Sequence, residues 1–274
     1  MNTKTRLKTT AFKKQIWDFY KDKKRAFPWR ETTDPYKILV SEIMLQQTQA
    51  DRVVAKYNSF LKKWPTVKKL AKATLREVLT EWSGLGYNRR GKNLWLLAKI
   101  VVSELAGSIP NTLNELEKLP GIGPYTARAV AAFAFNKPYA CIETNIRAVY
   151  IYYFFSKTKH KIADDTLFPL IEQTLDKKNP REWYYALMDY GSHLKKLKLS
   201  TNDLHKSYTK QSTFKGSMRE ARGAILRNLI ETQMTLRELQ GKIKIPEEKL
   251  TEALNALLKE KTIQQKAKKF IIAS

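Results

Sequence analysis

Cysteine is nearly missing from this chain, because Cys141 is the only one in 274 residues. A single thiol forms no disulfide within the chain and cannot supply the thiolates of an iron–sulfur cluster. Histidine is also scarce, with His160, His193 and His205. Their spacing is not that of metal ligands, and surface or helix-capping roles are favoured. No apolar run approaches the roughly 18 residues of a membrane span, and no signal-peptide core follows the basic N-terminus. We therefore expect a cytoplasmic protein without a protein-bound metal.

Acidic residues are few beside the basic ones. Lysine and arginine total 51 against 26 aspartates and glutamates, which gives a net charge of +25 and a pI near 9.9. An excess this large, with 11% aromatic residues, predicts contacts with a polyanion, a property shared by ribosomal and structural nucleic-acid-binding proteins. Hydrophobic residues make up 43% of the chain, so it can bury a core in one large or two ordinary domains.

The first part of the chain lacks the alternating pattern of β-strands. From Phe12 to about Leu199 the apolar residues follow helical spacing. Prolines lie between the periodic segments, where they begin or end helices: Pro28, Pro35, Pro65, Pro110, Pro120, Pro138 and Pro180. We therefore predict a mainly α-helical domain over residues 1–200.

The C-terminal part has a different pattern. Residues 201–216 are polar and aperiodic, which predicts a linker. Residues 217–274 then predict three helices and two short strands around a basic turn: Ala221–Thr232, Thr235–Gly241, Pro246–Lys259, Thr262–Gln265 and Lys268–Ile272. These elements resemble a small winged-helix module. A helical cap packed on the first domain is the alternative.

The segment Leu119–Ala127 holds a Gly-x-Gly turn between two helix-patterned segments. Gly121 and Gly123 allow positive φ and leave no side chain in the way, so the N–H groups that start the next helix can face a phosphate. An ordinary helix–helix turn is the alternative for a lone Gly-x-Gly. The turn therefore indicates a grip on the DNA backbone only together with other motifs.

Further segments accompany this hairpin: Phe27-Pro28-Trp29-Arg30, Ser41-Glu42-Ile43-Met44-Leu45-Gln46-Gln47-Thr48-Gln49, Gly84-Leu85-Gly86-Tyr87 with Arg90 and Asn93-Leu94, and Met188-Asp189-Tyr190-Gly191. Together they resemble the catalytic domain of adenine DNA glycosylases of the MutY kind, in the helix-hairpin-helix superfamily that includes endonuclease III. The resemblance runs from Phe12 to Lys195. It implies a monomeric, nucleoid-associated enzyme of base excision repair that binds double-stranded DNA. Its reaction would be hydrolysis of the N-glycosidic bond of a flipped-out adenine mispaired with guanine or 8-oxoguanine.

Glu42 lies where this resemblance places the family's general acid, on a helix that begins at Pro35. The apolar residues Ile43 and Met44 follow it directly. A carboxylic acid in an apolar pocket has a raised pKa and can protonate the departing base near neutral pH. The alternative is a solvated glutamate near a helix N-terminus, where the helix dipole stabilises it.

The resemblance also implies which residues hold the DNA. Gln46, Gln47 and Thr48 correspond to wedge residues that enter the duplex beside the expelled nucleotide, and Tyr87 corresponds to an intercalating tyrosine. A core role is the alternative for Tyr87. Further DNA contacts are expected at Arg90, Gly121, Gly123 and Asn145. The expected base pocket comprises Arg25, Trp29, Arg30 and Asp189, and the alternative for Asp189 is to tie helices together.

The resemblance places two residues near the reacting sugar, Tyr125 and Glu143, and the second departs from the family pattern. Tyr125 stands where bifunctional relatives have a Schiff-base lysine, and a phenol forms no imine, so the resemblance implies hydrolysis without an enzyme-linked intermediate. Glu143, followed by Thr144 and Asn145, stands where the family has a catalytic aspartate followed by glycine and asparagine. A carboxylate here stabilises the oxocarbenium-like sugar. The alternative is that Glu143 only caps the next helix.

Two larger departures concern whole features of the family. Four cysteines normally follow the position of Gly191 and bind an iron–sulfur cluster, but none follows here, as in the clusterless branch of the family. A monovalent cation at the hairpin is the one bound ion that the resemblance leaves open. The family's Nudix-like C-terminal domain, which helps to read 8-oxoguanine, is too large for the residues after Gly216. Removal of thymine or a damaged base opposite guanine, and DNA binding without catalysis, are therefore the alternative functions.

Overall fold

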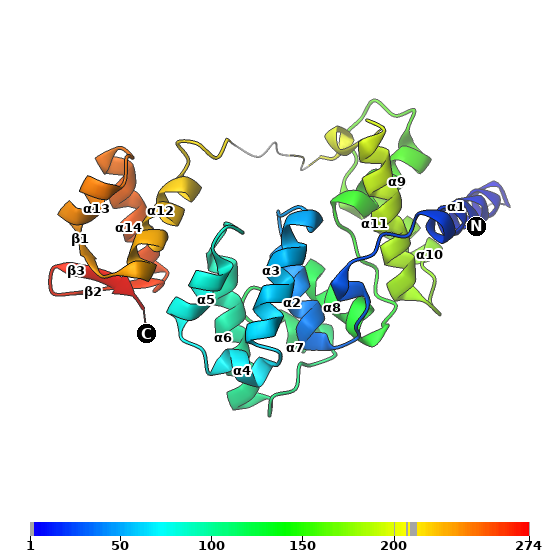
Figure 1. The fold of residues 1–274 in the computed structure, drawn as a ribbon. Helices are drawn as coiled ribbons and strands as arrows, with labels where there is room; N and C mark the ends of the chain where they lie inside the picture. Colours follow the sequence, from blue (N-terminus) through cyan, green and yellow to red (C-terminus); the bar gives the residue numbers. More distant parts are fainter. Residues whose placement is uncertain (1–2, 200, 207, 209–212, 274) are drawn as a thin grey trace. The chain divides into compact units, whose positions relative to one another are not determined.

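The computed structural model describes residues 3–199, 201–206, 208 and 213–273, and it is mainly α-helical as predicted (Figure 1). The chain forms two compact units, each built from several stretches of sequence. Unit 1 contains Met1–Ile38, Asn111–Glu117 and Ile122–Lys210, and unit 2 contains Leu39–Pro110, Lys118–Gly121 and Gln211–Ser274. None of the described helices combines the length and the apolar character that a membrane span requires.

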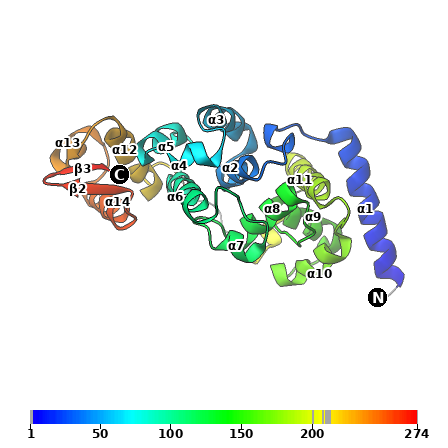
Figure 2. The same cartoon turned by 90° about the horizontal axis from the view of Figure 1, so that it is seen from below.

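Unit 1 is a group of helices around an aromatic core. Helix α11 packs against α9, α1 and α8, and α10 packs against α9 (Figure 2). The rings of Phe12, Tyr150 and Trp183 meet at this centre, with the Phe12 centroid 5.1 Å from Tyr150 and 6.1 Å from Trp183. The elements of this unit are α1 Thr3–Lys23, the 3-10 helix η1 Pro28–Arg30, α7 Leu113–Glu117, α8 Pro124–Phe135, α9 Thr144–Phe155, α10 Asp164–Thr174, α11 Pro180–Lys196 and the 3-10 helix η2 Asn202–Leu204.

Proline marks the start of three helical elements in unit 1. Pro28, Pro124 and Pro180 each stand at the first turn of their helix, where the missing N–H has no intrahelical acceptor. Pro169 is the exception, because it lies inside α10. Pro28 and Pro180 were among the prolines predicted to lie at helix boundaries, and Pro124 was not.

Unit 2 contains the chain's second group of helices. Its elements before the C-terminal segment are the end of α2 Pro35–Leu45, then α3 Ala50–Lys63, α4 Val67–Ala71, α5 Leu75–Trp82 and α6 Arg89–Glu104. Thr74 and Glu77 form a capping box at the start of α5. Trp82, at the end of α5, lies against Gly91 of α6, where an added Cβ would come within 2.7 Å of the indole. Glycine at this position therefore lets the two helices approach closely.

The C-terminal segment of unit 2 has the predicted helices and hairpin. These elements are α12 Met218–Glu231, β1 Met234–Thr235, α13 Leu236–Lys242, α14 Glu247–Lys259, β2 Ile263–Lys266 and β3 Lys269–Ile272. The three strands form an antiparallel sheet in the order β1-β3-β2, with Phe270 opposite both Met234 and Gln265. Strand β1 was not predicted, because two residues are too few to show a period. Apolar side chains of α12 and α14, with Ile225, Leu229, Leu250 and Leu254 among them, are buried in this segment.

The predicted linker over residues 201–216 is described only in part. Residues 207 and 209–212 lie outside the described residues, as does residue 200 at the predicted domain boundary. Residues 201–206 already belong to unit 1, since Ile162 donates to the Leu204 carbonyl at 2.8 Å and accepts from the Lys206 N–H at 2.9 Å. The polar composition of residues 201–206 therefore did not indicate their backbone hydrogen bonds with Ile162.

Candidate active site

Glu42 lies in the second half of α2 and is buried. Its exposed fraction is 6%, and its neighbours Ser41, Ile43 and Met44 are each about 1% exposed. Asp34 accepts hydrogen bonds from the backbone of Tyr36 at 2.9 Å and thereby starts the helix well before Glu42. The alternative of a solvated glutamate at a helix N-terminus is therefore wrong. The burial of Glu42 agrees with the apolar pocket expected for a general acid.

The loop after α2 contains the predicted wedge residues in a strained conformation. Gln47 is exposed and has φ +56°, in the left-handed region that favours glycine. The loop is closed by the Thr48 N–H, which donates to the Leu45 carbonyl at 3.1 Å. A non-glycine residue in this region costs about 1–3 kcal/mol and persists only where its surroundings hold it.

A second strained turn carries Tyr87. Gly84, Gly86 and Tyr87 all have positive φ, at +92°, +71° and +47°. The Trp82 indole N–H donates to the Gly86 carbonyl at 3.2 Å, and this bond fixes the turn to the end of α5. Tyr87 is half-buried, which contradicts a fully buried core role. The two glycines thus allow a tight turn that leaves an aromatic side chain partly at the surface.

Arg90 joins these two loops. Its guanidinium makes six hydrogen bonds within the described part of the chain, all to carbonyl or hydroxyl oxygens. The acceptors in and beside the wedge loop are Ile43 O, Met44 O, Gln46 O and Thr48 Oγ1, and those before Tyr87 are Leu85 O and Gly86 O.

The charge of Arg90 persists in this environment. The residue is 9% exposed, and burial lowers the pKa of Arg90 to about 10. It therefore stays protonated at neutral pH. Because the protein itself occupies most of its donors, the geometry suits positioning of the loops more than a direct phosphate contact.

The Gly-x-Gly hairpin has one glycine that the fold requires and one that it leaves open. Gly121 has φ +81°, and an added Cβ would lie 2.8 Å from the Asn93 Cβ. Gly123 is the N-cap of α8 with φ −99°, and nothing lies within 4 Å of its Cβ position. Tyr125 follows in the first turn of α8 and is partly exposed. The helix start at Gly123 is thus accessible from outside, as binding of a phosphate would require.

Glu143 is the N-cap of α9. One carboxylate oxygen, Oε1, accepts from the backbone N–H groups of Asn145 at 2.8 Å and Ile146 at 2.9 Å, and Oε2 accepts from Asn145 Nδ2 at 3.1 Å. Burial raises the pKa of Glu143, although these hydrogen bonds and the charge of Arg147 oppose the increase. The capping interpretation is therefore confirmed as geometry. It leaves the catalytic interpretation open, because an ionised carboxylate can both cap a helix and stabilise a positive charge.

The predicted base-pocket residues form a buried ion cluster. Asp189 accepts from Arg25 Nε at 2.6 Å, from Arg30 Nη2 at 2.8 Å and from Arg30 Nη1 at 2.9 Å. The Asp189 side chain is 1% exposed, Arg30 is 3% exposed and Arg25 is 32% exposed. Burial alone would raise the pKa of Asp189, but the hydrogen bonds and charges of the two arginines together lower it.

In this cluster Asp189 ties elements together, which is the alternative role considered for it. Trp29 is also buried and stacks on Phe27 at 4.9 Å between ring centroids. Arg25 is therefore the member of the predicted base pocket with substantial exposure. It also donates to Ser192 Oγ at 3.1 Å, a contact that nothing in the sequence indicated.

The residues after Gly191 do not fit an iron–sulfur cluster. Cys141 is buried, and its backbone N–H donates to the Tyr184 hydroxyl at 3.0 Å. Across the described ranges, no group of histidine, cysteine and carboxylate side chains has a metal-binding arrangement. Thiolate ligands are required for such a cluster, so no step of the reaction is assigned to one.

One of the histidines has a different environment from the predicted one. His205 is buried rather than at the surface, and its Nε2 lies 3.1 Å from Asp164. Arg147 also binds Asp164, at 2.7 Å. Through Asp164, these contacts attach the segment after η2 to helices α9 and α10.

The predicted site residues are distributed over both units. Unit 2 brings together Glu42, the wedge loop, Tyr87 and Arg90, and it adds Arg219, whose Nη1 lies 3.0 Å from the Tyr87 hydroxyl. Unit 1 brings together Arg25, Arg30 and Asp189, and separately Glu143 with Asn145. Arg219 could not be found from the sequence, because it is 132 residues from its partner.

Comparisons with known proteins indicate the family of this chain. The family described as HhH-GPD superfamily base excision DNA repair protein matches residues 40–170. Adenine DNA glycosylases of Buchnera aphidicola and of human are 37% and 36% identical, each over 67% of this chain. These matches cover 53% and 36% of the two relatives, so the chain spans about half or less of their length.

Solved structures extend the comparison to the fold. A thermostable thymine-DNA glycosylase is 31% identical with a TM-score of 0.61, over 69% of this chain and 88% of that one. Endonuclease III in a trapped covalent complex with DNA has a TM-score of 0.54 at 20% identity, over 71% of this chain and 86% of that one, and supports the fold alone. The chain belongs to the HhH-GPD superfamily of base excision DNA repair proteins.

Proposed function

We propose that this protein is a monofunctional DNA glycosylase that removes adenine mispaired with guanine or 8-oxoguanine. The observation that carries the proposal is the buried Glu42 beside a strained wedge loop, in a chain 37% identical to an adenine DNA glycosylase. The protein acts as a monomer on double-stranded DNA and is found in the cytoplasm, at the nucleoid. The domain division into residues 1–200, 201–216 and 217–274, the last being winged-helix-like, is part of the same proposal.

The reaction breaks the bond between C1′ of deoxyribose and the base nitrogen. Glu42 donates its proton to the adenine, so that the base leaves as a neutral molecule. The Glu143 carboxylate stabilises the positive charge that develops on the sugar. Water then adds to C1′ and releases a proton, which returns Glu42 to its acid form. Tyr125 offers no amine at the hairpin, so the product is an abasic site and no covalent enzyme–DNA intermediate forms.

The DNA is held through contacts with its backbone and through insertion of side chains. Gln46, Gln47 and Thr48 fill the space that the expelled nucleotide leaves, and Tyr87 enters the opposite stack. Arg90 positions the wedge loop and the Tyr87 turn through hydrogen bonds to their carbonyls. This role replaces the direct DNA contact expected from the sequence.

Other groups bind the DNA backbone and the expelled base. The amides at Gly121 and Gly123 bind a phosphate, with Asn145 as a further contact, and a monovalent cation can assist at the hairpin. Arg25 and Trp29 border the base pocket, and Asp189 with Arg30 supports its wall. The net charge of +25 supports binding of the backbone as a whole.

A second candidate function is removal of thymine or a damaged base opposite guanine. Two observations favour it over DNA binding without catalysis. The thymine-DNA glycosylase is 31% identical over 88% of its own chain, and Glu143 replaces the usual aspartate at the sugar. A longer side chain moves the charge relative to C1′, which can alter which base is accepted.

Excision assays on a panel of duplexes test the proposal. Labelled DNA with adenine opposite guanine or 8-oxoguanine, or thymine opposite guanine, is incubated with protein and treated with alkali to cleave abasic sites. We expect cleavage at the adenine, and loss of at least ~10² in rate for Glu42→Gln, which keeps the shape but holds no transferable proton. The exposed Glu31→Gln is the matched control and should keep the parent rate.

Each other outcome of this panel has a defined meaning. Cleavage at thymine alone supports the second candidate. Binding without cleavage at any mispair supports a DNA-binding protein that lacks catalysis. A Glu42→Gln variant at the parent rate shows that Glu42 is not the acid.

Borohydride trapping tests the monofunctional chemistry separately. Tyr125→Lys places an amine at the hairpin, and borohydride should then fix a covalent adduct with DNA. An adduct with the unaltered protein would show that another amine attacks the sugar.

A further inference from the structure

Two arginines hold the Tyr87 side chain in unit 2. The Arg90 guanidinium carbon lies 5.5 Å from the centre of the ring, and the Arg219 guanidinium carbon lies 5.4 Å from it. Arg219 Nη1 also donates to the Tyr87 hydroxyl at 3.0 Å. The phenol is therefore contacted at its face and at its oxygen, which restricts how the ring can turn.

Arg219 is placed by the first turn of α12. Ser217 caps this helix by accepting from the Glu220 N–H, and Lys249 Nζ donates to the Gly216 carbonyl just before it. At the other end of α12, Arg76 of α5 donates to the Ile230 carbonyl at 3.2 Å. Helix α12 is thus held at both ends, and these contacts fix the backbone that carries Arg219.

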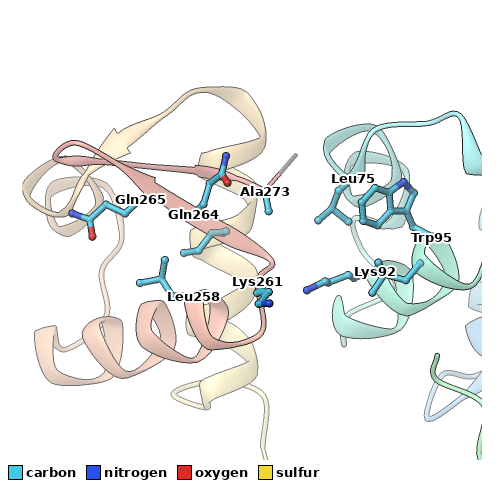
Figure 3. Close-up of a pocket in the computed structure, with 10 residues that line it drawn as sticks. Leu75, Lys92, Trp95, Leu258, Lys261, Gln264, Gln265 and Ala273 are labelled. Carbon is cyan, nitrogen blue, oxygen red and sulfur yellow. The ribbon is translucent and has the colours of Figure 1, made fainter. Parts of the chain in front are cut away.

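Further contacts attach the same segment near α6. Arg222 of α12 binds Glu260 through two hydrogen bonds of 3.0 and 2.5 Å, and Lys92 of α6 donates to the Glu260 carbonyl. A hollow opens beside these contacts, with Leu75, Trp95 and Lys92 on one wall and Lys261 and Gln264 on the other (Figure 3). The residues lining it include no carboxylate. The same segment contacts the proposed site through Arg219, whose Nη1 lies 3.0 Å from the Tyr87 hydroxyl.

We infer that Arg219 is a positioning residue that sets Tyr87 for insertion into DNA, and so couples the C-terminal segment to the wedge. This inference rests on the proposed glycosylase function. Without Arg219, the strained Tyr87 turn would keep its backbone through Arg90 but lose the contact at the hydroxyl. Insertion would then require ordering of the ring at the moment of binding, which weakens the complex.

The geometry requires a guanidinium and not merely a positive charge. One planar group donates from its edge to the hydroxyl while it lies near the ring. A lysine in its place keeps the charge but has a single nitrogen on a flexible stem. A phosphate contact alone would need only the charge, so Arg219→Lys separates positioning from backbone binding.

The test uses a duplex with a tetrahydrofuran abasic site opposite 2-aminopurine, whose fluorescence rises when its stacking is disturbed. No excision is needed, so insertion is measured independently of catalysis. The variants are Arg219→Met, Arg219→Lys, Tyr87→Phe and the double variant Arg219→Met/Tyr87→Phe. Arg227→Met is the control. Arg227 is exposed on the same helix, and its replacement by methionine removes the same charge as Arg219→Met does.

Arg219→Met should lower the fluorescence rise and weaken binding about tenfold, as expected for loss of a charged hydrogen bond. Arg219→Lys should recover little of this, and the double variant should be weaker than Tyr87→Phe by no more than the effect of Arg227→Met. Arg227→Met should lie within about twofold of the parent and share only the change in salt dependence. Equal urea midpoints for Arg219→Met and Arg227→Met show that folding is not the cause.

The inference is wrong if Arg219→Met matches Arg227→Met in fluorescence, or if Arg219→Lys restores the parent signal. Its failure can be told apart from failure of the proposed function. A parent protein that excises mispaired adenine, with fluorescence independent of Arg219, keeps the function and loses the inference. A parent that excises no base, with Arg219-dependent fluorescence, keeps the inference and loses the function.

Discussion

Two buried arginines, one in each unit, are stabilised in opposite ways. Arg30 in unit 1 faces the carboxylate of Asp189 at 2.8 Å, so its charge is balanced by an opposite one. The hydrogen bonds of Arg90 in unit 2 go to neutral oxygens, so these acceptors do not balance its positive charge next to the wedge loop. Balanced charges make a structural joint, whereas carbonyl dipoles can hold a cation that still attracts a polyanion.

The difference follows from what each arginine has to hold. Arg30 connects two segments through a single side chain, and one carboxylate is sufficient for that. Arg90 holds two backbone turns in which Gln47 and Tyr87 have positive φ. It does so by donating hydrogen bonds to backbone carbonyls, and these bonds form only when the turns have this conformation. We conclude that unit 2 uses its arginine to keep a strained surface in shape, while unit 1 uses arginines to close its interior.

Asp189→Asn should produce the largest loss of stability in this comparison. The change keeps the side-chain size but leaves the buried Arg30 without its counter-charge, which typically costs about 3–5 kcal/mol. Urea unfolding at neutral pH measures the loss. The exposed pair of Lys14 and Asp18 provides the control, and Asp18→Asn should leave the urea midpoint close to that of the parent.

The same pair of proteins gives a pH test. Because the folded-state pKa of Asp189 is lowered, its stabilisation is complete above the unfolded value of 3.8 and is lost as the pH falls through the lower folded value. The gap between parent and Asp189→Asn should therefore stay constant from neutral pH to about 5 and shrink below 3.8. A gap that widens on acidification would contradict the ion-cluster account.

Arg90→Lys should destabilise the protein less than Asp189→Asn does, but it should slow excision of the base. The lysine keeps the charge but cannot reach both loops, so we expect a loss of about 1–3 kcal/mol in unfolding free energy. Displacement of the wedge loop should slow single-turnover excision by about 10- to 100-fold. Retention of the parent rate would show that Arg90 does not position the wedge.

A smaller contrast lies within the hairpin. Gly121→Ala should cost about 1–2 kcal/mol, because alanine is strained at φ +81° and its Cβ meets Asn93. Gly123→Ala should change stability by less than about 1 kcal/mol yet weaken DNA binding, because its methyl would occupy the open approach to the helix start. Equal DNA affinity for Gly123→Ala and the parent would argue against phosphate binding there.

The sequence predicted the parts of this molecule that depend on local patterns. Proline and apolar spacing located the helices, and the C-terminal helices and hairpin agree with the predicted ranges within a few residues. Motif identity indicated Glu42 and the wedge loop, and the burial of Glu42 agrees with its expected environment.

Contacts between distant residues could not be predicted in the same way. The acceptors of Arg90 in the wedge loop are more than forty residues away, so the sequence suggested a DNA contact where the fold has an internal joint. Asp189 left two roles open, because a carboxylate that meets a purine and one that meets two arginines look alike in sequence. The positive φ of Gln47 and Tyr87 was likewise hidden, since neither residue type favours that conformation.

We propose that Glu143 supplies a negative charge to the reaction and does not merely cap α9. Single-turnover excision by Glu143→Gln measures this directly, because glutamine still offers an oxygen to the Asn145 and Ile146 N–H groups. We predict a loss of about 10²–10³ in rate with unchanged DNA binding, and impairment of Glu143→Asp as well, since the surroundings are built around the longer side chain. A fully active Glu143→Gln would reduce Glu143 to a helix cap, and a Glu143→Asp variant faster than the parent on an adenine mispair would show that the glutamate serves another substrate.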